Sequence, residues 1–120
     1  MRADMLESVL IGLNGSSSDI KASGVVSTDG LMMASVLPQG MDEDRVGAMS
    51  AAMLSLGSRT LEELARGELE QVLVKGNNGY VLMTYAGKEA VLTVLTKPKA
   101  KLGLIFLDVK RAAANIADLL

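Results

Sequence analysis

Two neighbouring segments of the sequence, residues 80–86 and 89–97, carry apolar side chains at odd and even positions alike. Because successive side chains of a strand point to opposite faces of a sheet, strands with this pattern need apolar cover on both faces. Gly87-Lys88 joins the two segments. Residues 68–75 precede them across Gly76-Asn77-Asn78-Gly79, whose central asparagines suit a positive-φ hairpin turn. The sequence therefore predicts a three-strand meander that lies between two other layers.

Two further strands are predicted nearer the amino terminus, over residues 21–27 and 31–37. Thr28-Asp29-Gly30 separates them, and an Asp-Gly pair tolerates the positive φ that a tight hairpin needs. Pro38-Gln39-Gly40 ends the second of these strands. Five strands spaced by about 4.8 Å make a sheet about 24 Å wide.

Apolar side chains spaced by three and four residues predict a helix near each end of the sequence. The first helix covers residues 4–14 and is broken by Gly15 and the three serines after it. The last helix begins at Leu102 and continues to Leu120, after a basic linker that starts at Lys97. No apolar run approaches the roughly 18 residues that a membrane-spanning helix needs.

A long central helix is predicted from Asp42 to Gly67. Asp42 can cap its first turn, and glycine is a common left-handed terminator after a helix. Gly57-Ser58 lies inside this element, and Thr60 with Glu63 could form a second capping box. One bent helix and a helix that restarts near Gly57 therefore both fit the sequence, and we prefer one helix with a bend.

The predicted order is helix, two strands, helix, three strands, helix, in one α+β domain that spans residues 1–120. Short connections put the first and last helices on one face of the sheet and the central helix alone on the other. One packed helix covers about 10 Å of a sheet about 24 Å wide, so the central helix is too narrow for its face. We expect a second copy to supply the missing cover, with residues 68–75 of the two copies paired edge to edge. The alternative is a monomer whose methionines and alanines fill an ordinary core.

The composition excludes most catalytic chemistry and most nucleic-acid binding. The sequence has no cysteine and no histidine, which excludes disulfides, thiolate or imidazole metal sites, and nucleophiles activated by histidine. A net charge of −2 does not favour binding to the phosphates of DNA or RNA. Two tyrosines and one phenylalanine provide few rings on which bases could stack. We therefore predict a non-enzymatic protein with no cofactor and no metal. The missing export signal and cysteines favour the cytoplasm.

Charge is distributed unevenly along the sequence. Residues 42–70 are predominantly acidic, whereas residues 75–111 are predominantly basic. Lys97, Lys99 and Lys101 fall in the linker before the last helix, and three cations near one loop could attract an acidic surface or phospholipid headgroups. A solvated linker is the simpler interpretation, and the same holds for the two differently charged segments.

Three segments in this order resemble one protein family over nearly the whole chain: the hairpin at 24–31, the acid-led helix that contains 48–56, and residues 101–104 at the start of the last helix. They resemble the Roadblock dynein light chain family and its bacterial and archaeal MglB-like branch. The resemblance implies a profilin-like three-layer fold with strand order 2-1-5-4-3. It also implies a homo- or heterodimer whose sheet continues across both subunits.

The resemblance further implies a partner, because members of that family bind, scaffold or stimulate Ras-like small GTPases or serve as dynein light chains. Their paired second helices contact the GTPase. The corresponding dimer and partner positions here are Asp42, Arg45, Met49, Ala52, Met53, Leu56 and Arg59. The predicted edge pairing adds Leu69, Gln71 and Leu73.

We therefore expect a homodimeric adaptor that binds one nucleotide state of a Ras-like GTPase and so shifts its switch population. Arg45 and Arg59 invite comparison with an arginine finger, but we interpret them as solvated ion-pair partners. One alternative is a structural light chain or scaffold with equal affinity for the GTP and GDP forms. Another is a small-molecule sensor domain, although Tyr80 and Tyr85 fall on opposite faces of the predicted sheet and do not converge.

Overall fold

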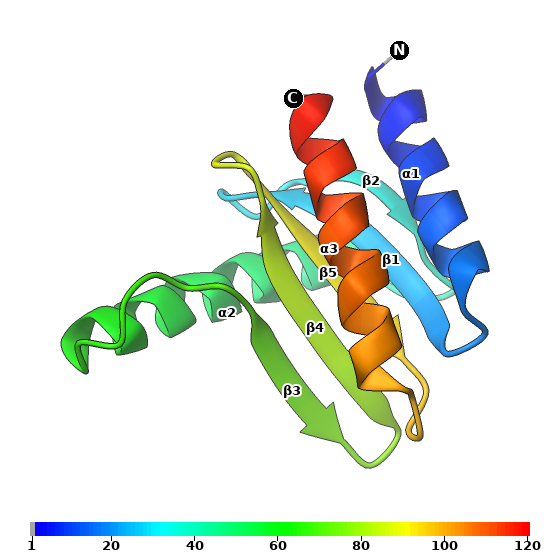
Figure 1. Ribbon diagram of the computed structural model, residues 1–120. Helices are drawn as coiled ribbons and strands as arrows, with labels where there is room; N and C mark the ends of the chain where they lie inside the picture. Colours follow the sequence, from blue (N-terminus) through cyan, green and yellow to red (C-terminus); the bar gives the residue numbers. More distant parts are fainter. Residues whose placement is uncertain (1) are drawn as a thin grey trace.

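A five-stranded antiparallel sheet with the order β2-β1-β5-β4-β3 lies between two helical layers in the computed structural model, which describes residues 2–120 (Figure 1). The predicted element order and strand order are both confirmed. The elements are α1 (Arg2–Ser16), β1 (Ile20–Ser27), β2 (Met32–Val36), α2 (Glu43–Glu63), β3 (Val72–Gly76), β4 (Gly79–Ala86), β5 (Ala90–Thr96) and α3 (Leu102–Asp118).

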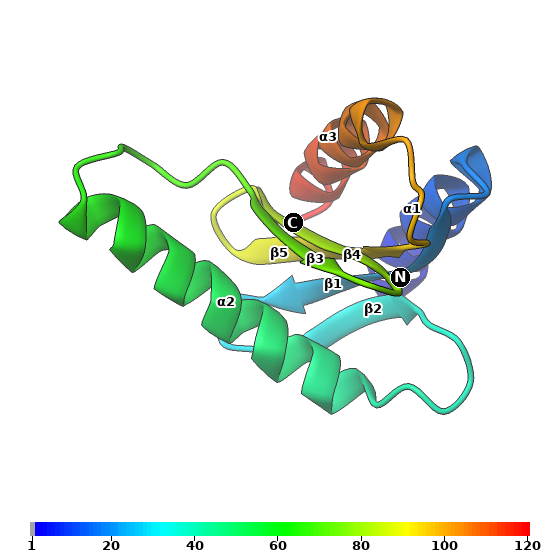
Figure 2. The same cartoon turned by 90° about the horizontal axis from the view of Figure 1, so that it is seen from below.

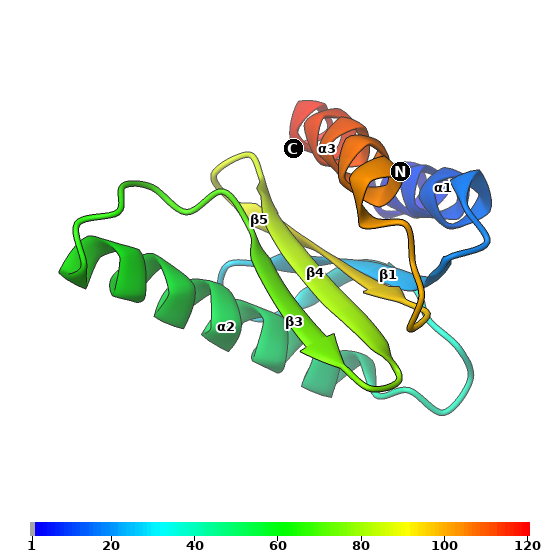
Figure 3. The same cartoon turned by 60° about the horizontal axis from the view of Figure 1, so that its bottom comes forward.

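The helices divide two against one over the faces of the sheet, as predicted. Helices α1 and α3 lie side by side on one face, and α2 crosses the other face obliquely (Figures 2 and 3). The core beneath α1 and α3 contains many buried side chains from both helices and all inner strands. The core beneath α2 is much smaller, and its fully buried members are Val26, Leu54, Met83 and Val91.

The central strands are apolar on both faces because each face packs against a helical layer. In β5, Val91 belongs to the core beneath α2, whereas Leu92 and Val94 belong to the core beneath α1 and α3. In β4, Met83 and Leu82 divide in the same way. The predicted alternation in these two strands is therefore confirmed.

The β1–β2 hairpin turns at the predicted Asp-Gly pair. Gly30 has a φ of +93°, and its N–H donates to the carbonyl of Ser27 at 2.9 Å. The N–H of Ser27 donates to the carbonyl of Leu31 at 2.8 Å and closes the hairpin. The β3–β4 turn differs from the prediction: Gly79, with a φ of +143°, carries the positive φ there, and Asn77 and Asn78 do not.

Helix α2 is a single helix through Gly57, and it ends at Glu63 rather than near Gly67. The residue in the left-handed conformation is Ala65, with a φ of +53°. The N–H of Ala65 donates to the carbonyl of Glu62, and the N–H of Arg66 donates to that of Leu61. These two bonds form a Schellman motif, which terminates the helix earlier than the glycine predicts.

Strand β3 begins at Val72, four residues later than predicted from residues 68–75. The side chain of Thr84 in β4 donates a hydrogen bond to the carbonyl of Glu70 at 2.8 Å. The ladder between β3 and β4 ends at the Val72–Met83 pair. Beyond it, Glu70 is held to β4 by this side-chain hydrogen bond and not by strand pairing. Leu69 and Gln71 therefore precede the edge strand instead of lying in it.

Candidate functional site

The predicted partner face lies on α2, and the first turn of this helix is fixed by side-chain caps. Asp42 Oδ1 accepts hydrogen bonds from the backbone N–H of Asp44 at 2.9 Å and of Arg45 at 3.3 Å. Ser35 in β2 donates a hydrogen bond to the carboxylate of Glu43. Asp42 thus serves as the N-cap, and the acidic first turn faces the positive end of the helix dipole.

Helix α2 contacts the sheet through a narrow stripe, since only Gly47, Ser50 and Leu54 are buried among residues 43–63. At Gly47 the backbones meet: a Cβ atom on this residue would lie 2.6 Å from the carbonyl oxygen of Gly30. At Ser50, the hydroxyl accepts a hydrogen bond of 2.8 Å from the buried hydroxyl of Thr93 in β5. These contacts fix the distance of α2 from the sheet and the rotation of α2 about its own axis.

The opposite face of α2 is exposed and partly apolar. Met49 is 62% exposed and Leu56 is 60% exposed, and helical spacing places both next to the partly buried Met53, so the three side chains form one apolar patch. At 3.6 residues per turn, the predicted positions on this helix fall within about one third of its circumference. Those positions are Arg45, Met49, Ala52, Met53, Leu56 and Arg59.

An apolar groove of about 330 Å³ lies between this helix and the edge of the sheet. Its walls are Met53, Leu56 and neighbouring residues of α2 on one side, and Leu69, Gln71 and Val72 on the other. Met53 and Leu56, which were predicted on the helix face, thus lie in the same groove as Leu69 and Gln71, which were predicted on the sheet edge. Gly57 lies in the groove wall, and a Cβ there would approach Val72 Cγ2 to 3.1 Å.

Leu73 is the predicted edge residue that lies apart from this groove. It pairs with Leu82 in the β3–β4 ladder and therefore faces the α3 side, because directly opposed residues of antiparallel strands share a face. Val74 faces the α2 side and is 41% exposed. Since β3 ends the sheet, its outer edge offers backbone groups that another strand could pair with.

The charged groups of this region are solvated. Neither Arg45 nor Arg59 has a carboxylate within ion-pair distance among residues 2–120, where the single ion pair joins Lys97 to Asp19. Asp19 lies in the loop before β1, away from the groove. The backbone N–H of Lys101 and the ammonium of Lys97 lower the pKa of its carboxyl group below the usual value.

The two tyrosines lie on opposite faces of β4, as predicted. The hydroxyl of Tyr85 lies 3.2 Å from that of Ser58 in α2, whereas the Tyr80 ring lies beneath the ammonium of Lys75 at 5.9 Å. No cluster of three potential metal-ligating side chains occurs within residues 2–120. Over the same residues, no helix combines the length and the apolar character needed to cross a membrane.

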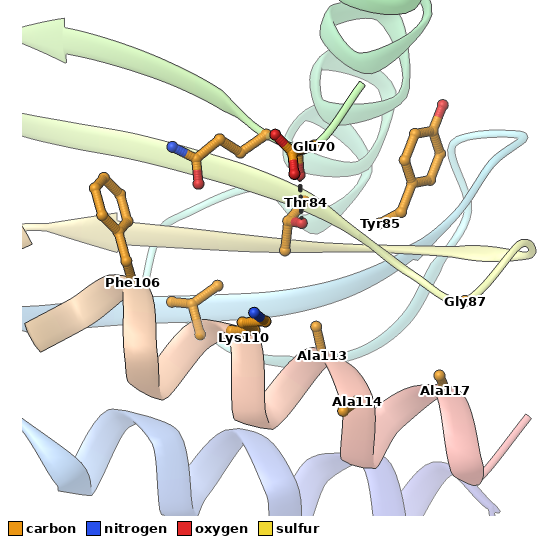
Figure 4. A pocket seen from close by; sticks show the side chains of 11 residues that line it. Glu70, Thr84, Tyr85, Gly87, Phe106, Lys110, Ala113, Ala114 and Ala117 are labelled. Carbon is orange, nitrogen blue, oxygen red and sulfur yellow. Dashed lines mark hydrogen bonds between the residues drawn. The ribbon is translucent and has the colours of Figure 1, made fainter. Parts of the chain in front are cut away.

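A larger hollow, which the sequence analysis missed, lies between β4 and α3. It has a volume of about 610 Å³ and is lined by Phe106, Lys110, Ala113 and Ala117 of α3, with Glu70 and Thr84 opposite (Figure 4). Figure 4 shows the ring of Tyr85 directed away from these α3 side chains. The run of alanines in α3 is the one sequence signal that could have indicated it, because small side chains leave space above a strand.

Comparison with known proteins matches this chain to one domain family. The family model for the Roadblock/LC7 domain matches residues 8–96. An uncharacterised protein of Methanocaldococcus jannaschii is 46% identical over 112 residues, which is 93% of this chain and 96% of that protein.

Two solved structures share the fold. A structure described as MglB with tetrameric arrangement superposes with a TM-score of 0.89 at 18% identity, covering 98% of this chain and 89% of that one. Myxococcus xanthus MglB superposes with a TM-score of 0.88 at 20% identity, covering 97% and 87%. At these identities the likeness concerns the fold alone.

Proposed function

The chain belongs to the Roadblock/LC7 domain family, and from this premise we propose that it acts as a homodimeric adaptor or regulator of a Ras-like small GTPase. The observation that carries the proposal is the exposed apolar face of α2, which continues into the groove at the β3 edge. An adaptor of this kind contributes a binding surface and no catalytic group.

The groove and the β3 edge support the dimer. In the proposed dimer, β3 of one copy pairs with β3 of its partner, so that the sheet continues across both subunits and the two α2 helices lie side by side. Met53 and Leu56 lie on the side of α2 that faces this edge. Burial of their apolar surface supplies the main driving force for association.

The residues of α2 that lie farthest from the β3 edge support the GTPase contact. Arg45, Ala52 and Arg59 lie farther from the edge than Met53 does, so they stay accessible when two α2 helices pair. Paired helices present a largely rigid platform with an apolar centre and a charged rim, which is the usual composition of a protein interface. Arg45 and Arg59 belong to the rim, where they orient the partner and set the rate of association.

Regulation requires that the platform prefers one nucleotide state of the GTPase. A ligand shifts a two-state equilibrium only by the ratio of its affinities for the two states, so a tenfold preference corresponds to about 1.4 kcal/mol. The catalytic groups in this mechanism are those of the GTPase, whose switch segments the platform would hold in one arrangement.

The test uses a small GTPase whose gene lies beside the gene of this protein. The GTPase is loaded with GDP or with a non-hydrolysable GTP analogue, and its affinity and hydrolysis rate are measured with and without the protein. We expect a nucleotide-dependent affinity that weakens at least tenfold when Arg45 and Arg59 are both replaced by glutamate. Lys88→Glu, in the exposed β4–β5 turn, is the matched charge reversal outside the platform.

Equal affinity for both nucleotide states and an unchanged hydrolysis rate would contradict regulation and favour a scaffold. Failure to bind any small GTPase from the same genome would contradict the partner class altogether.

A further inference from the structure

The outer ridge of α3 is an exposed apolar strip that the proposed GTPase platform does not use. Leu104 and Leu107 are each 61% exposed, and they line neither the hollow beside β4 nor the shallow groove between α1 and α3. Helical periodicity places Arg111 on the same ridge, one turn beyond Leu107. We call Leu104, Leu107 and Arg111 the α3 crest.

Basic side chains lie beside the crest in the loop before α3 and on its β4 side. Residues 97–111 carry five basic side chains and one acidic side chain, in a protein whose net charge is −2. Lys99 and Lys101 are exposed in the loop that leads into α3, and Lys110 is exposed beside the crest. None of these three has a carboxylate within ion-pair distance among residues 2–120. The acidic side chain, Asp108, faces α1 and accepts a hydrogen bond from Ser16 at 3.2 Å.

The same end of the molecule collects further positive charge. Lys75, at the end of β3, lies near the β3–β4 turn at the end of the sheet where the β5–α3 loop also lies (Figure 1). Helix α3 begins there without a side-chain cap, so the positive end of its dipole is open to solvent. Lys97 differs from its neighbours because Asp19 neutralises it at 2.9 Å. Lys99 and Lys101 are therefore the cations of the linker that remain available.

We propose that the α3 crest and the cations beside it form a peripheral contact surface for membranes that contain anionic phospholipids. Charge complementarity identifies the occupant, since cations beside exposed apolar side chains match phosphate headgroups above an acyl layer. The shape supports the same occupant. Leu104 and Leu107 are exposed on α3, which lies beside α1 on the outside of the molecule (Figure 3), where a bilayer interface accepts them and a protein partner would need a matching groove.

The crest lies on the face of the sheet opposite α2, so membrane contact leaves the GTPase platform accessible (Figure 2). If the β3 strands pair as proposed above, the two-fold axis is perpendicular to the sheet and both crests point to the same side. Simultaneous membrane contact by both crests of a dimer then raises the overall affinity above that of one crest. This gain in affinity rests on the proposed dimer, whereas the contact made by one crest does not.

The test is co-sedimentation with vesicles of mixed phosphatidylglycerol and phosphatidylcholine, against vesicles of pure phosphatidylcholine. We expect binding to the anionic vesicles at about 0.1 M salt and loss of most of it at about 1 M salt. Replacing Lys99 and Lys101 by glutamine should lower the partition coefficient roughly 25-fold, about fivefold for each cation. Replacing Leu104 and Leu107 by serine should lower it at least tenfold, since each methylene group that is buried contributes about fourfold.

Matched controls carry the same changes elsewhere on the surface. Leu31→Ser alters a leucine that is 69% exposed in the β1–β2 hairpin, and Lys88→Gln removes an exposed lysine in the β4–β5 turn. Both should bind vesicles as the unaltered protein does. Because every altered side chain is exposed, circular dichroism and the thermal midpoint should confirm that all variants fold.

Two outcomes would overturn the proposal. One is equal binding, or no binding, to anionic and neutral vesicles at low salt. The other is binding that depends on the lysines but is unchanged in the double leucine variant, which would instead indicate a surface for an acidic protein. Neither outcome affects the proposed GTPase contact, because that contact is measured without lipid and on the other face.

Discussion

The ammonium nitrogen of Lys97 lies 2.9 Å from Oδ1 of Asp19, across the two chain segments that enter β1 and leave β5. Oδ2 of Asp19 accepts the backbone N–H of Lys101 at 2.9 Å, and its carbonyl accepts the backbone N–H of Lys97 at the same distance. One aspartate therefore fastens the loop before β1 to the loop that leads into α3.

This arrangement predicts an acid-sensitive contribution to stability. The N–H of Lys101 and the ammonium of Lys97 lower the pKa of Asp19, so the folded state favours the ionised carboxylate. The contribution is complete above the usual aspartate pKa of about 4 and is lost as the pH falls through the lower folded pKa. Asp19→Asn should therefore lower the urea midpoint at pH 7, and that difference should disappear as the pH falls through the lowered pKa of Asp19. Glu7→Gln, an exposed change in α1, is the control, and a difference between Asp19→Asn and the unaltered protein that persists at low pH would contradict this assignment.

Gly47→Ala should destabilise the protein although alanine is the better helix former. The new Cβ would lie 2.6 Å from the Gly30 carbonyl oxygen, a backbone atom that cannot rotate away. We expect a loss of about 1–3 kcal/mol in the free energy of unfolding, measured by urea titration. Gly12→Ala in α1 is the matched control, because nothing lies within 4 Å of its added Cβ, and it should gain up to about 1 kcal/mol. Equal gains in both variants would show that α2 is not in backbone contact with the hairpin.

Ser50→Ala should lower stability by about 1–3 kcal/mol, because it leaves the buried Thr93 hydroxyl without a partner. Replacing both residues, as Ser50→Ala with Thr93→Val, removes the unpaired group. The double variant should then lose less than the sum of the two single losses, by at least about 0.5 kcal/mol. Denaturant titration of the four proteins measures this coupling, and strict additivity would mean that the two hydroxyls do not interact.

Ala65→Gly should stabilise the protein by about 0.5–1 kcal/mol, since alanine at a φ of +53° carries a steric penalty that glycine avoids. Ala114→Gly, at an exposed position inside α3, should instead cost about 1 kcal/mol. Thermal unfolding distinguishes the two variants, and a shift in the same direction for both would contradict the left-handed conformation at residue 65.

Met53→Glu should separate the proposed dimer, because it places a charge in the groove at the β3 edge. Leu56→Glu should do the same from a position that is 60% exposed, where the monomer tolerates the change. Sedimentation velocity reports the mass of each variant, and Leu31→Glu in the hairpin should remain dimeric. If Met53→Glu sediments as a dimer of unchanged stability, the subunits meet on another surface.

Local signals explain what the sequence predicted well. The Asp-Gly turn before Leu31 and the Asp42 cap depend on neighbouring residues only, and both occur where predicted. The division of helices between the two faces followed from short connections and from the alternation in β4 and β5. The strand order came from the family resemblance, because antiparallel pairing partners are not encoded in the local pattern of a strand.

The errors fall where distant residues decide the structure. β3 begins late because Thr84, fourteen positions away, bonds to the carbonyl of Glu70. The end of α2 is the exception, because the bonds that end it at Ala65 instead of Gly67 are local backbone bonds, and they hold an alanine in a conformation that its side chain disfavours. The Ser50–Thr93 bond and the hollow beside α3 depend on how elements pack together, which no single segment of the sequence specifies.

The close approach of Gly47 to the Gly30 carbonyl makes the hairpin turn a support for α2. The amino-terminal half of the helix is seated there, whereas hollows lie beneath its later half around Ser58 and Leu61. The later half is held to the sheet by buried Leu54 and by the contact between the hydroxyls of Ser58 and Tyr85. A substitution that lifts the helix at Gly47 would therefore tilt α2 about these contacts and alter the width of the groove that contains Met53 and Leu56. The shape of the proposed partner surface thus depends on the hairpin turn beneath the start of the helix.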